Sequence, residues 1–135
     1  MVEIDVEYSG DLHCQTTHGP SGATIHTDAP KDNEGKGEAF SPTDLVAAAL
    51  GSCMLTIMGI VARRHGINIT GARAHVEKEM VADPARRIAK LPVQITLPAA
   101  LSSQERQMLE AAALTCPVHK SLHPNIESKI QFRYQ

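Results

Sequence analysis

Apolar and polar side chains alternate at the start of the chain, which is typical of a strand with one buried face. From residue 2 to residue 8 every second side chain is apolar and those between are acidic, the period of a half-buried β-strand. Turn residues then separate a second expected strand at residues 12–17 and a third at residues 23–27. Residues 28–40 are polar and rich in glycine and charge, so they predict a surface loop.

A strong helix start follows this loop. Ser41 suits the N-cap, Pro42 suits the first helical position, and Asp44 can reach back to the cap as in a capping box. We expect the helix to run to about His65 and to end at Gly66, because glycine favours the backbone conformation that follows a helix C-terminus.

The rest of the chain predicts a mixture of strands and helices. The expected elements are strands at residues 67–80 and 88–97, a helix from a second capping box at residues 102–105 to about residue 114, a short helix from Pro117, and a strand at residues 126–134. The order β-β-β-α-β-β-α-β predicts an α+β fold. With no internal repeat in sight, residues 1–135 are expected to form a single domain.

Composition narrows the class of protein. The chain has 135 residues, 42% of them apolar, no Trp and only two Phe and two Tyr, so its core should be aliphatic. A net charge of −2 and few aromatic side chains argue against nucleic-acid binding. Three cysteines do not make a disulfide scaffold, and the N-terminus has no apolar signal segment. We therefore expect a cytoplasmic protein with reduced thiols.

The long helix also raises the question of a membrane span. Residues 45–62 carry no charge, a length near the lower limit for crossing a bilayer. The stretch contains Gly51, Ser52 and Gly59 and is rich in alanine, so it is weakly hydrophobic for a span. We favour a helix buried by protein on most sides, with no membrane partner, and a second copy of the chain would help to bury it.

Two cysteines lie on the expected helices. Cys53 is predicted to share one face of the long helix with other apolar residues, namely Val46, Ala49, Leu50, Ile57, Ile60 and Val61. Cys116 follows the second helix on the face of Leu109, and because Pro117 comes next it can be the N-cap of the short helix. Both thiols should point inward. Each can be a small core residue, or the two can be a redox pair.

The sequences around these cysteines resemble one family. The segment Ser41-Pro42-Thr43-Asp44-Leu45, followed by Ala48-Ala49-Leu50-Gly51-Ser52-Cys53, is similar to the central-helix signature of the OsmC/Ohr thiol peroxidases. The segment Thr115-Cys116-Pro117-Val118-His119-Lys120-Ser121-Leu122 is similar to the family's second-cysteine signature. The resemblance covers essentially the whole chain, and is closest to the broader OsmC-like branch.

This resemblance implies a fold, an activity and two site residues. The family fold is an intertwined homodimer with long central helices at its middle. By motif, Cys53 would be the peroxidatic thiolate that reduces an organic hydroperoxide, and Cys116 would resolve its sulfenic acid as a disulfide, which an external dithiol reopens. The resemblance implies no metal and no other cofactor.

One departure from the family pattern concerns the charged residues beside the thiol. The peroxidase branch uses an Arg from the N-terminal strands, held by an acidic residue, whereas the first 62 residues here contain no Arg. Lys31 or Lys36 can supply charge but not the guanidinium fork. Asp44 and Glu38 are candidates for the acidic residue, although Asp44 is also suited to capping the helix.

Other candidate sites carry weaker patterns. Cys14 can lie near the site as a third thiol, or be a partly buried bystander. Cys116, His119 and His123 have a spacing that can present metal ligands, but no further motif completes a zinc site, and the remaining histidines form no spaced cluster. The methionines, Met54, Met58 and Met108, are expected to fill the core.

Two functional hypotheses remain open from the sequence. In the first, the chain is a thiol peroxidase in which Cys53 and Cys116 form a redox pair. In the second, it is a non-catalytic dimeric protein that binds a small molecule or senses redox state, with cysteines that mainly pack. The retained cysteine motifs favour the first hypothesis, and the missing Arg favours the second.

Overall fold

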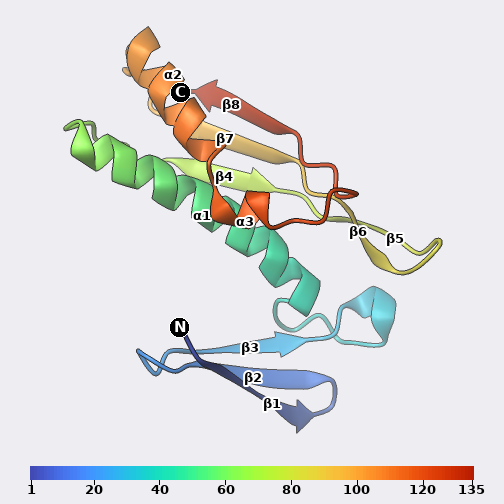
Figure 1. Ribbon diagram of the computed structural model, residues 1–135. Helices are drawn as coiled ribbons and strands as arrows, with labels where there is room; N and C mark the ends of the chain where they lie inside the picture. Colours follow the sequence, from blue (N-terminus) through green and yellow to red (C-terminus); the bar gives the residue numbers. More distant parts are fainter. The chain divides into compact units, whose positions relative to one another are not determined.

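The computed structural model describes all residues from Met1 to Gln135. They form two compact units, Met1–Val46 and Ala47–Gln135, which are described separately. Eight strands and three α-helices account for the regular structure (Figure 1). The architecture is therefore the expected mixture of α and β elements.

The first unit is built on a three-stranded antiparallel sheet. The order is β1 (Ile4–Gly10), β2 (His13–His18) and β3 (Thr24–Asp28). Cys14 lies in the middle strand between Tyr8 and Thr27. All three predicted strands and the turns between them are confirmed, each within two residues of its expected start.

This sheet lacks an apolar core. The buried residues of the first unit are Thr27, Asp28 and Ser41, all of them polar. The exposed apolar side chains of its strands and N-terminus are Met1, Val2, Ile4, Val6, Tyr8 and Ile25. The expectation that the first strand is half-buried is therefore wrong within one chain, because no second layer of this unit covers the apolar side of the alternation.

The predicted loop is confirmed and folds back on the sheet. It contains one short 3-10 turn, η1 (Lys31–Asn33), and its ends are joined by a hydrogen bond of 3.2 Å from the Asp28 N–H to the Phe40 carbonyl. A second bond of 3.3 Å joins the Gly37 N–H to the Ala29 carbonyl. These bonds hold Glu38, which lies between them, close to the end of β3.

The long helix α1 (Pro42–Arg64) begins and ends where the capping signals predicted. The Ser41 N–H donates to Asp44 Oδ2 at 2.9 Å, and the Asp44 N–H donates to Ser41 Oγ at 3.1 Å, which completes a capping box. Gly66 follows with a positive φ of 66°, as expected at a helix C-terminus. By length and composition alone, with a mean hydropathy of 2.2, α1 is also capable of spanning a membrane.

The second unit contains two small sheets in place of two long strands. One sheet has the order β4 (Arg73–Val76), β7 (Val93–Leu97) and β8 (Ile130–Tyr134), and a separate hairpin joins β5 (Glu79–Val81) to β6 (Arg87–Lys90). The continuous strands expected at residues 67–80 and 88–97 were therefore wrong.

Two local features explain these breaks. The Ala72 N–H donates to the Ile69 carbonyl, and Gly71 has a φ of 92°, so a turn occupies the start of the first expected strand. Pro92 interrupts the second, since proline has no N–H to donate to a strand ladder.

Helices α1 and α2 (Ser103–Ala113) cover one face of the β4–β7–β8 sheet (Figure 1). The largest buried side chains of this core are Leu50, Met54, Met58, Leu91, Ile95, Leu97 and Leu109. The helix approaches β4 closely at Gly51, where an added Cβ would lie 3.0 Å from Val76 Cγ2. Met54 and Met58 are core residues as predicted, whereas Met108 is half-buried.

The predicted apolar face of α1 was wrong in its orientation. The residues that α1 buries are Ala47, Leu50, Gly51, Met54, Met58 and Ala62. Ala49 and Ile60, which were expected inside, are exposed. Cys53 consequently lies at the flank of the buried face and is half-buried. Hydrophobicity alone misplaced this face because α1 is apolar on nearly all sides.

Helix α2 is held by a cap at its N-terminus and by side-chain contacts with β8. Its N-cap Ser102 and Glu105 form the second predicted capping box. Near its middle, Glu110 accepts a hydrogen bond from the Tyr134 hydroxyl of β8, and the Arg106 guanidinium lies 4.0 Å from the centre of the Tyr134 ring. Burial is the main cause that raises the pKa of Tyr134, so the phenol stays protonated and its hydroxyl donates a hydrogen bond to the Glu110 carboxylate.

The cap of α2 yields a stability prediction. Replacing Ser102 by Ala removes the acceptor of the Glu105 N–H and should lower the free energy of unfolding by about 1 kcal/mol. The matched control is Ser103→Ala, which changes the neighbouring exposed serine without touching the box and should be nearly neutral. Urea denaturation followed by circular dichroism measures both. Equal losses in the two variants would contradict the assigned cap.

Candidate functional site

The second unit brings Cys53 and Cys116 together. Cys53 lies on α1, and Cys116 lies between the end of α2 and the start of the short helix α3 (Pro117–Lys120) (Figure 1). The two thiols lie close enough for Cys53 to raise the pKa of Cys116, and neither is in a disulfide. The sequence placed both cysteines on neighbouring apolar helices, and their direct contact is the structural result.

Cys116 is held rigidly by the backbone around it. Its side chain is completely buried, and it is the N-cap of α3 as predicted, with Sγ accepting a hydrogen bond of 3.4 Å from the His119 N–H. Its own N–H donates to the Ala113 carbonyl at 3.2 Å. The sulfur therefore has a fixed position facing α1.

The environment of Cys116 keeps its proton on the sulfur. Burial, first, and the hydrogen bond with Cys53, second, raise the pKa of the Cys116 thiol, although the His119 and Val118 N–H groups act in the opposite direction. At neutral pH the Cys116 sulfur therefore carries its proton.

The two thiols also differ in their exposure to solvent. Cys53 is half-buried whereas Cys116 has no exposed surface. A small oxidant from solvent can reach only the Cys53 sulfur, and the Cys116 sulfur lies next to that of Cys53. This is the arrangement that a two-step thiol oxidation needs, with one sulfur attacking the oxidant and the other closing a disulfide.

The two acidic candidates lie in the first unit and have observed local partners. The Asp44 carboxylate accepts the Ser41 N–H in the cap of α1. Glu38 Oε2 lies 3.2 Å from His13 Nε2. Their proposed part beside Cys53 stays a prediction.

The lysines proposed as substitutes for Arg also lie in the first unit. Lys36 forms an ion pair of 3.2 Å with Asp11. Lys31 begins η1. Neither observation assigns either lysine to the thiol pair.

The spacing of Cys116, His119 and His123 does not produce a set of convergent metal ligands. The one group of three or more His, Cys, Asp or Glu side chains that converges in the structure is His13, Asp28 and Glu38. This group could not be predicted from the sequence, because its members come from a strand, a strand end and a loop with no regular spacing. Only the polar, charged segment at residues 28–40 indicated that ligand side chains could gather there.

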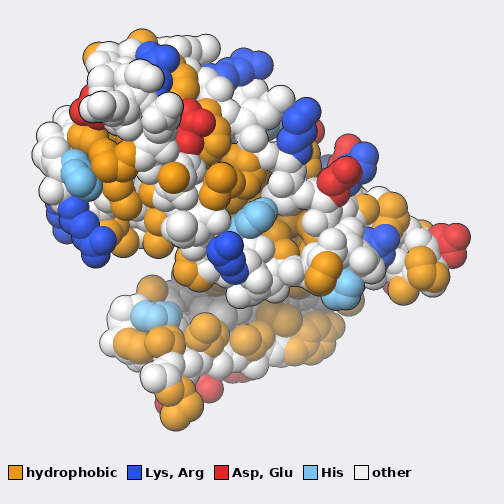
Figure 2. Space-filling view, turned by 45° about the horizontal axis from the view of Figure 1, so that its top comes forward, with side chains coloured by type: hydrophobic (Ala, Val, Ile, Leu, Met, Phe, Trp, Pro, Cys, Tyr) orange, Lys and Arg blue, Asp and Glu red, His pale blue; other side chains and the backbone are white.

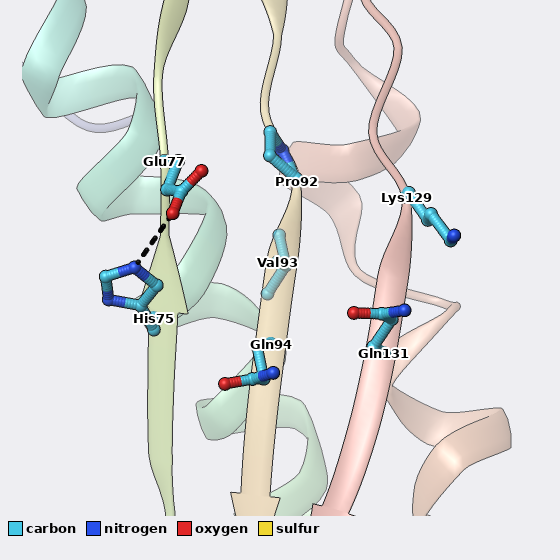
Figure 3. A pocket seen from close by; sticks show the side chains of 7 residues that line it. All are labelled: His75, Glu77, Pro92, Val93, Gln94, Lys129 and Gln131. Carbon is cyan, nitrogen blue, oxygen red and sulfur yellow. Dashed lines mark hydrogen bonds and ion pairs between the residues drawn. The ribbon is translucent and has the colours of Figure 1, made fainter.

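A shallow pocket also lies on the face of the β4–β7–β8 sheet away from the helices (Figure 3). Its polar lining includes Gln94, Lys129 and an exposed pair, His75 and Glu77, whose side chains are 3.4 Å apart. The pocket contains neither cysteine. It is therefore separate from the thiol pair.

Comparison with known proteins identifies the family. The family model described as OsmC-like protein matches residues 35–131. An uncharacterized protein of Acinetobacter baylyi is 27% identical over 85% of this chain and 87% of its own. A crystal structure from Psychrobacter arcticus, provisionally described as an osmotic stress induced and detoxification response protein, is 49% identical with a TM-score of 0.91, covering 98% and 96% of the two chains.

A more distant solved structure confirms the fold. The organic hydroperoxide resistance protein OsmC of Legionella pneumophila is 20% identical, with a TM-score of 0.76 over 98% of this chain and 96% of that one. Together with the match of the family model over most of the sequence, these similarities show that the chain belongs to the OsmC-like family.

Proposed function

We propose that this protein is a thiol-dependent peroxidase that reduces organic hydroperoxides through Cys53 and Cys116. The observation that carries the proposal is the direct contact between a half-buried thiol and a fully buried one. The names of solved relatives give the substrate class, since the Legionella pneumophila protein is described as an organic hydroperoxide resistance protein.

The first step is attack by Cys53 on the peroxide. The Cys53 thiolate forms a bond to the distal oxygen of the hydroperoxide, the O–O bond breaks, and the alkoxide leaves with a proton as an alcohol. Cys53 becomes a sulfenic acid, and the hydroperoxide has taken up two electrons. The neighbouring Cys116 thiol lies beside the sulfenic acid formed in this step.

The second step is resolution by Cys116. After losing its proton, the Cys116 sulfur attacks the Cys53 sulfur, the S–O bond breaks, and hydroxide takes a proton to leave as water. The product is a Cys53–Cys116 disulfide. An external dithiol then reduces this disulfide by thiol–disulfide exchange and is itself oxidised, which returns both cysteines to thiols.

The surroundings of the thiols favour an apolar substrate. Cys53 lies on a helix without charge from Leu45 to Ala62, next to the aliphatic core of the second unit. Burying the organic part of a hydroperoxide against such a surface contributes about 25 cal/mol per Å². This environment fits alkyl or aryl hydroperoxides better than the small polar hydrogen peroxide.

A second candidate function keeps the fold without the catalysis. The absence of Arg before residue 63 leaves no guanidinium in the first unit to orient a peroxide. In this alternative the protein binds an apolar small molecule or senses redox state. The two functions differ in turnover, because only a peroxidase consumes hydroperoxide continuously when a dithiol is supplied.

We also propose that the active form is a homodimer. A unit of 46 residues that buries no apolar side chain is too small to be stable by its own contacts. Hydrophobic side chains reach the surface on both units (Figure 2). A second copy of the chain that covers the apolar row of β1 would supply the missing core.

Substitution of the two cysteines tests the peroxidase. With cumene hydroperoxide and excess dithiothreitol, Cys53→Ser should abolish turnover. In Cys116→Ser, one equivalent of peroxide should leave a sulfenic acid that dimedone traps, and excess peroxide should drive it to the sulfinic acid. Cys14→Ser is the matched control and should keep full turnover. Retained activity in Cys53→Ser would overturn the assignment of the nucleophile.

The raised pKa of Cys116 predicts a particular pH dependence of alkylation. The thiolate is the reactive form, so at neutral pH iodoacetamide should modify Cys53 well before Cys116. Modification of Cys116 should increase only at a pH above the range of an ordinary cysteine, because burial and the bond to Cys53 hold its proton. Mass spectrometry of digested protein after timed alkylation measures both sites. Faster alkylation of Cys116 at neutral pH would contradict its assigned state.

The dimer is tested on strand β1. Val6→Lys places a charge in the exposed apolar row, and in a symmetric dimer it removes a buried valine twice, at about 1.5 kcal/mol or more each, so association should weaken roughly a hundredfold. Glu7→Lys puts the same side chain in the acidic row of the strand and is the control. Light scattering after size-exclusion chromatography measures the mass in solution. A wild-type monomer would reject the proposal.

A further inference from the structure

Three side chains from separate segments of the first unit converge on one point. His13 comes from β2, Asp28 from the end of β3 and Glu38 from the loop before α1. His13 Nε2 lies 3.2 Å from Glu38 Oε2 and 3.5 Å from Asp28 Oδ2. All three potential ligand atoms lie within 4.8 Å of one another.

The other nitrogen of His13 is already engaged. Nδ1 lies 2.6 Å from the Asp11 carbonyl oxygen, and because a carbonyl only accepts, Nδ1 carries a proton. In the neutral imidazole the lone pair is then on Nε2, which faces the two carboxylates. A backbone partner on the far nitrogen is the usual way in which a metal-binding histidine is oriented.

Asp28 has an unsatisfied oxygen in this cluster. Its side chain is 1% exposed, and although Oδ2 accepts the Glu38 N–H at 3.0 Å, the buried Oδ1 has no hydrogen-bond partner. A buried charged oxygen without a partner is costly and calls for an explanation, such as an ion. His13 and Glu38 are 25% and 57% exposed, so an ion from solvent can reach it.

We propose that His13, Asp28 and Glu38 form a binding site for one divalent transition-metal ion of the Zn²⁺ class. Metal bonds of about 2.1 Å place neighbouring ligand atoms about 3.0–3.5 Å apart in octahedral or tetrahedral geometry, and the two distances from His13 Nε2 to the carboxylate oxygens fit this range. An imidazole with two carboxylates suits such an ion better than Mg²⁺ or Ca²⁺, which prefer oxygen alone. Solvent completes the coordination.

The charges around the cluster allow a cation. Asp28 and Glu38 supply two negative charges that a divalent ion balances. Lys36 is the positive group nearby, and its ammonium forms an ion pair with Asp11 at 3.2 Å. That pairing leaves the two carboxylates of the cluster for the ion. The positive charge of Lys36 also interacts with the carboxylates of Asp28 and Glu38. It would partly repel a metal cation, so the affinity for the ion should be moderate.

The fold of the first unit gives the ion a structural role. This unit buries no apolar side chain, and small units without a core are commonly stabilised by a metal. The ion would join β2 and β3 to the loop that leads into α1. Its binding energy would then add to the stability of the folded state.

A proton is the competing occupant. His13 as an imidazolium would form ion pairs with Asp28 and Glu38 and need no metal. These two states are distinguished by direct titration of the metal-free, reduced protein with Co²⁺, which takes zinc sites and absorbs visible light. Ligation by nitrogen and oxygen gives d–d bands only, whereas binding to a cysteine thiolate adds an intense near-ultraviolet charge-transfer band.

The expected result is saturation at one Co²⁺ per chain without the thiolate band, displacement by Zn²⁺, and a higher melting temperature with Zn²⁺. His13→Gln, Asp28→Asn and Glu38→Gln should each weaken binding about tenfold or more. Glu38→Gln changes an exposed side chain, so it keeps the test valid if Asp28→Asn fails to fold.

The matched control is His75→Gln. It removes the histidine of an exposed His–Glu pair that lacks a buried carboxylate, and it should leave binding unchanged. Three results would each contradict the proposed site. They are no saturable Co²⁺ binding, Co²⁺ binding that shows only the cysteine-thiolate band, and a loss of Co²⁺ affinity in His75→Gln equal to that in the three site variants.

Discussion

The position of α1 is the constraint on which the rest of the structure depends. One side of this helix supplies Leu50, Met54 and Met58 to the core of the second unit, and Gly51 lets it approach β4 closely. Cys53 lies at the flank of that buried side and is half-buried, so its sulfur is packed against the protein and still accessible to a molecule from solvent. A rotation of α1 that buried Cys53 fully would close the site to solvent, and the opposite rotation would separate it from Cys116.

The difference in burial gives the two cysteines different proposed roles. Cys116 is the fully buried N-cap of α3. It keeps its proton because burial and its interaction with the Cys53 thiol raise its pKa. In the proposed cycle the electrons pass through the two sulfurs and an external dithiol.

Local signals in the sequence predicted the helix boundaries well, because caps are set by residues that contact one another over three positions. Ser41 with Asp44 and Ser102 with Glu105 both form the expected boxes. Patterns that depend on tertiary packing were less informative. The buried face of α1 depends on neighbouring elements, and the cluster of His13, Asp28 and Glu38 depends on how a loop folds back.

The central claim is that Cys53 and Cys116 form a catalytic redox pair, and one measurement tests it most directly. Reduced wild-type protein is mixed with one equivalent of cumene hydroperoxide, quenched, digested without reductant and analysed by mass spectrometry. We expect a cross-linked Cys53–Cys116 peptide, cumyl alcohol in equal amount, and full reversal by dithiothreitol. Unchanged thiols after the peroxide has had ample time to react would contradict it.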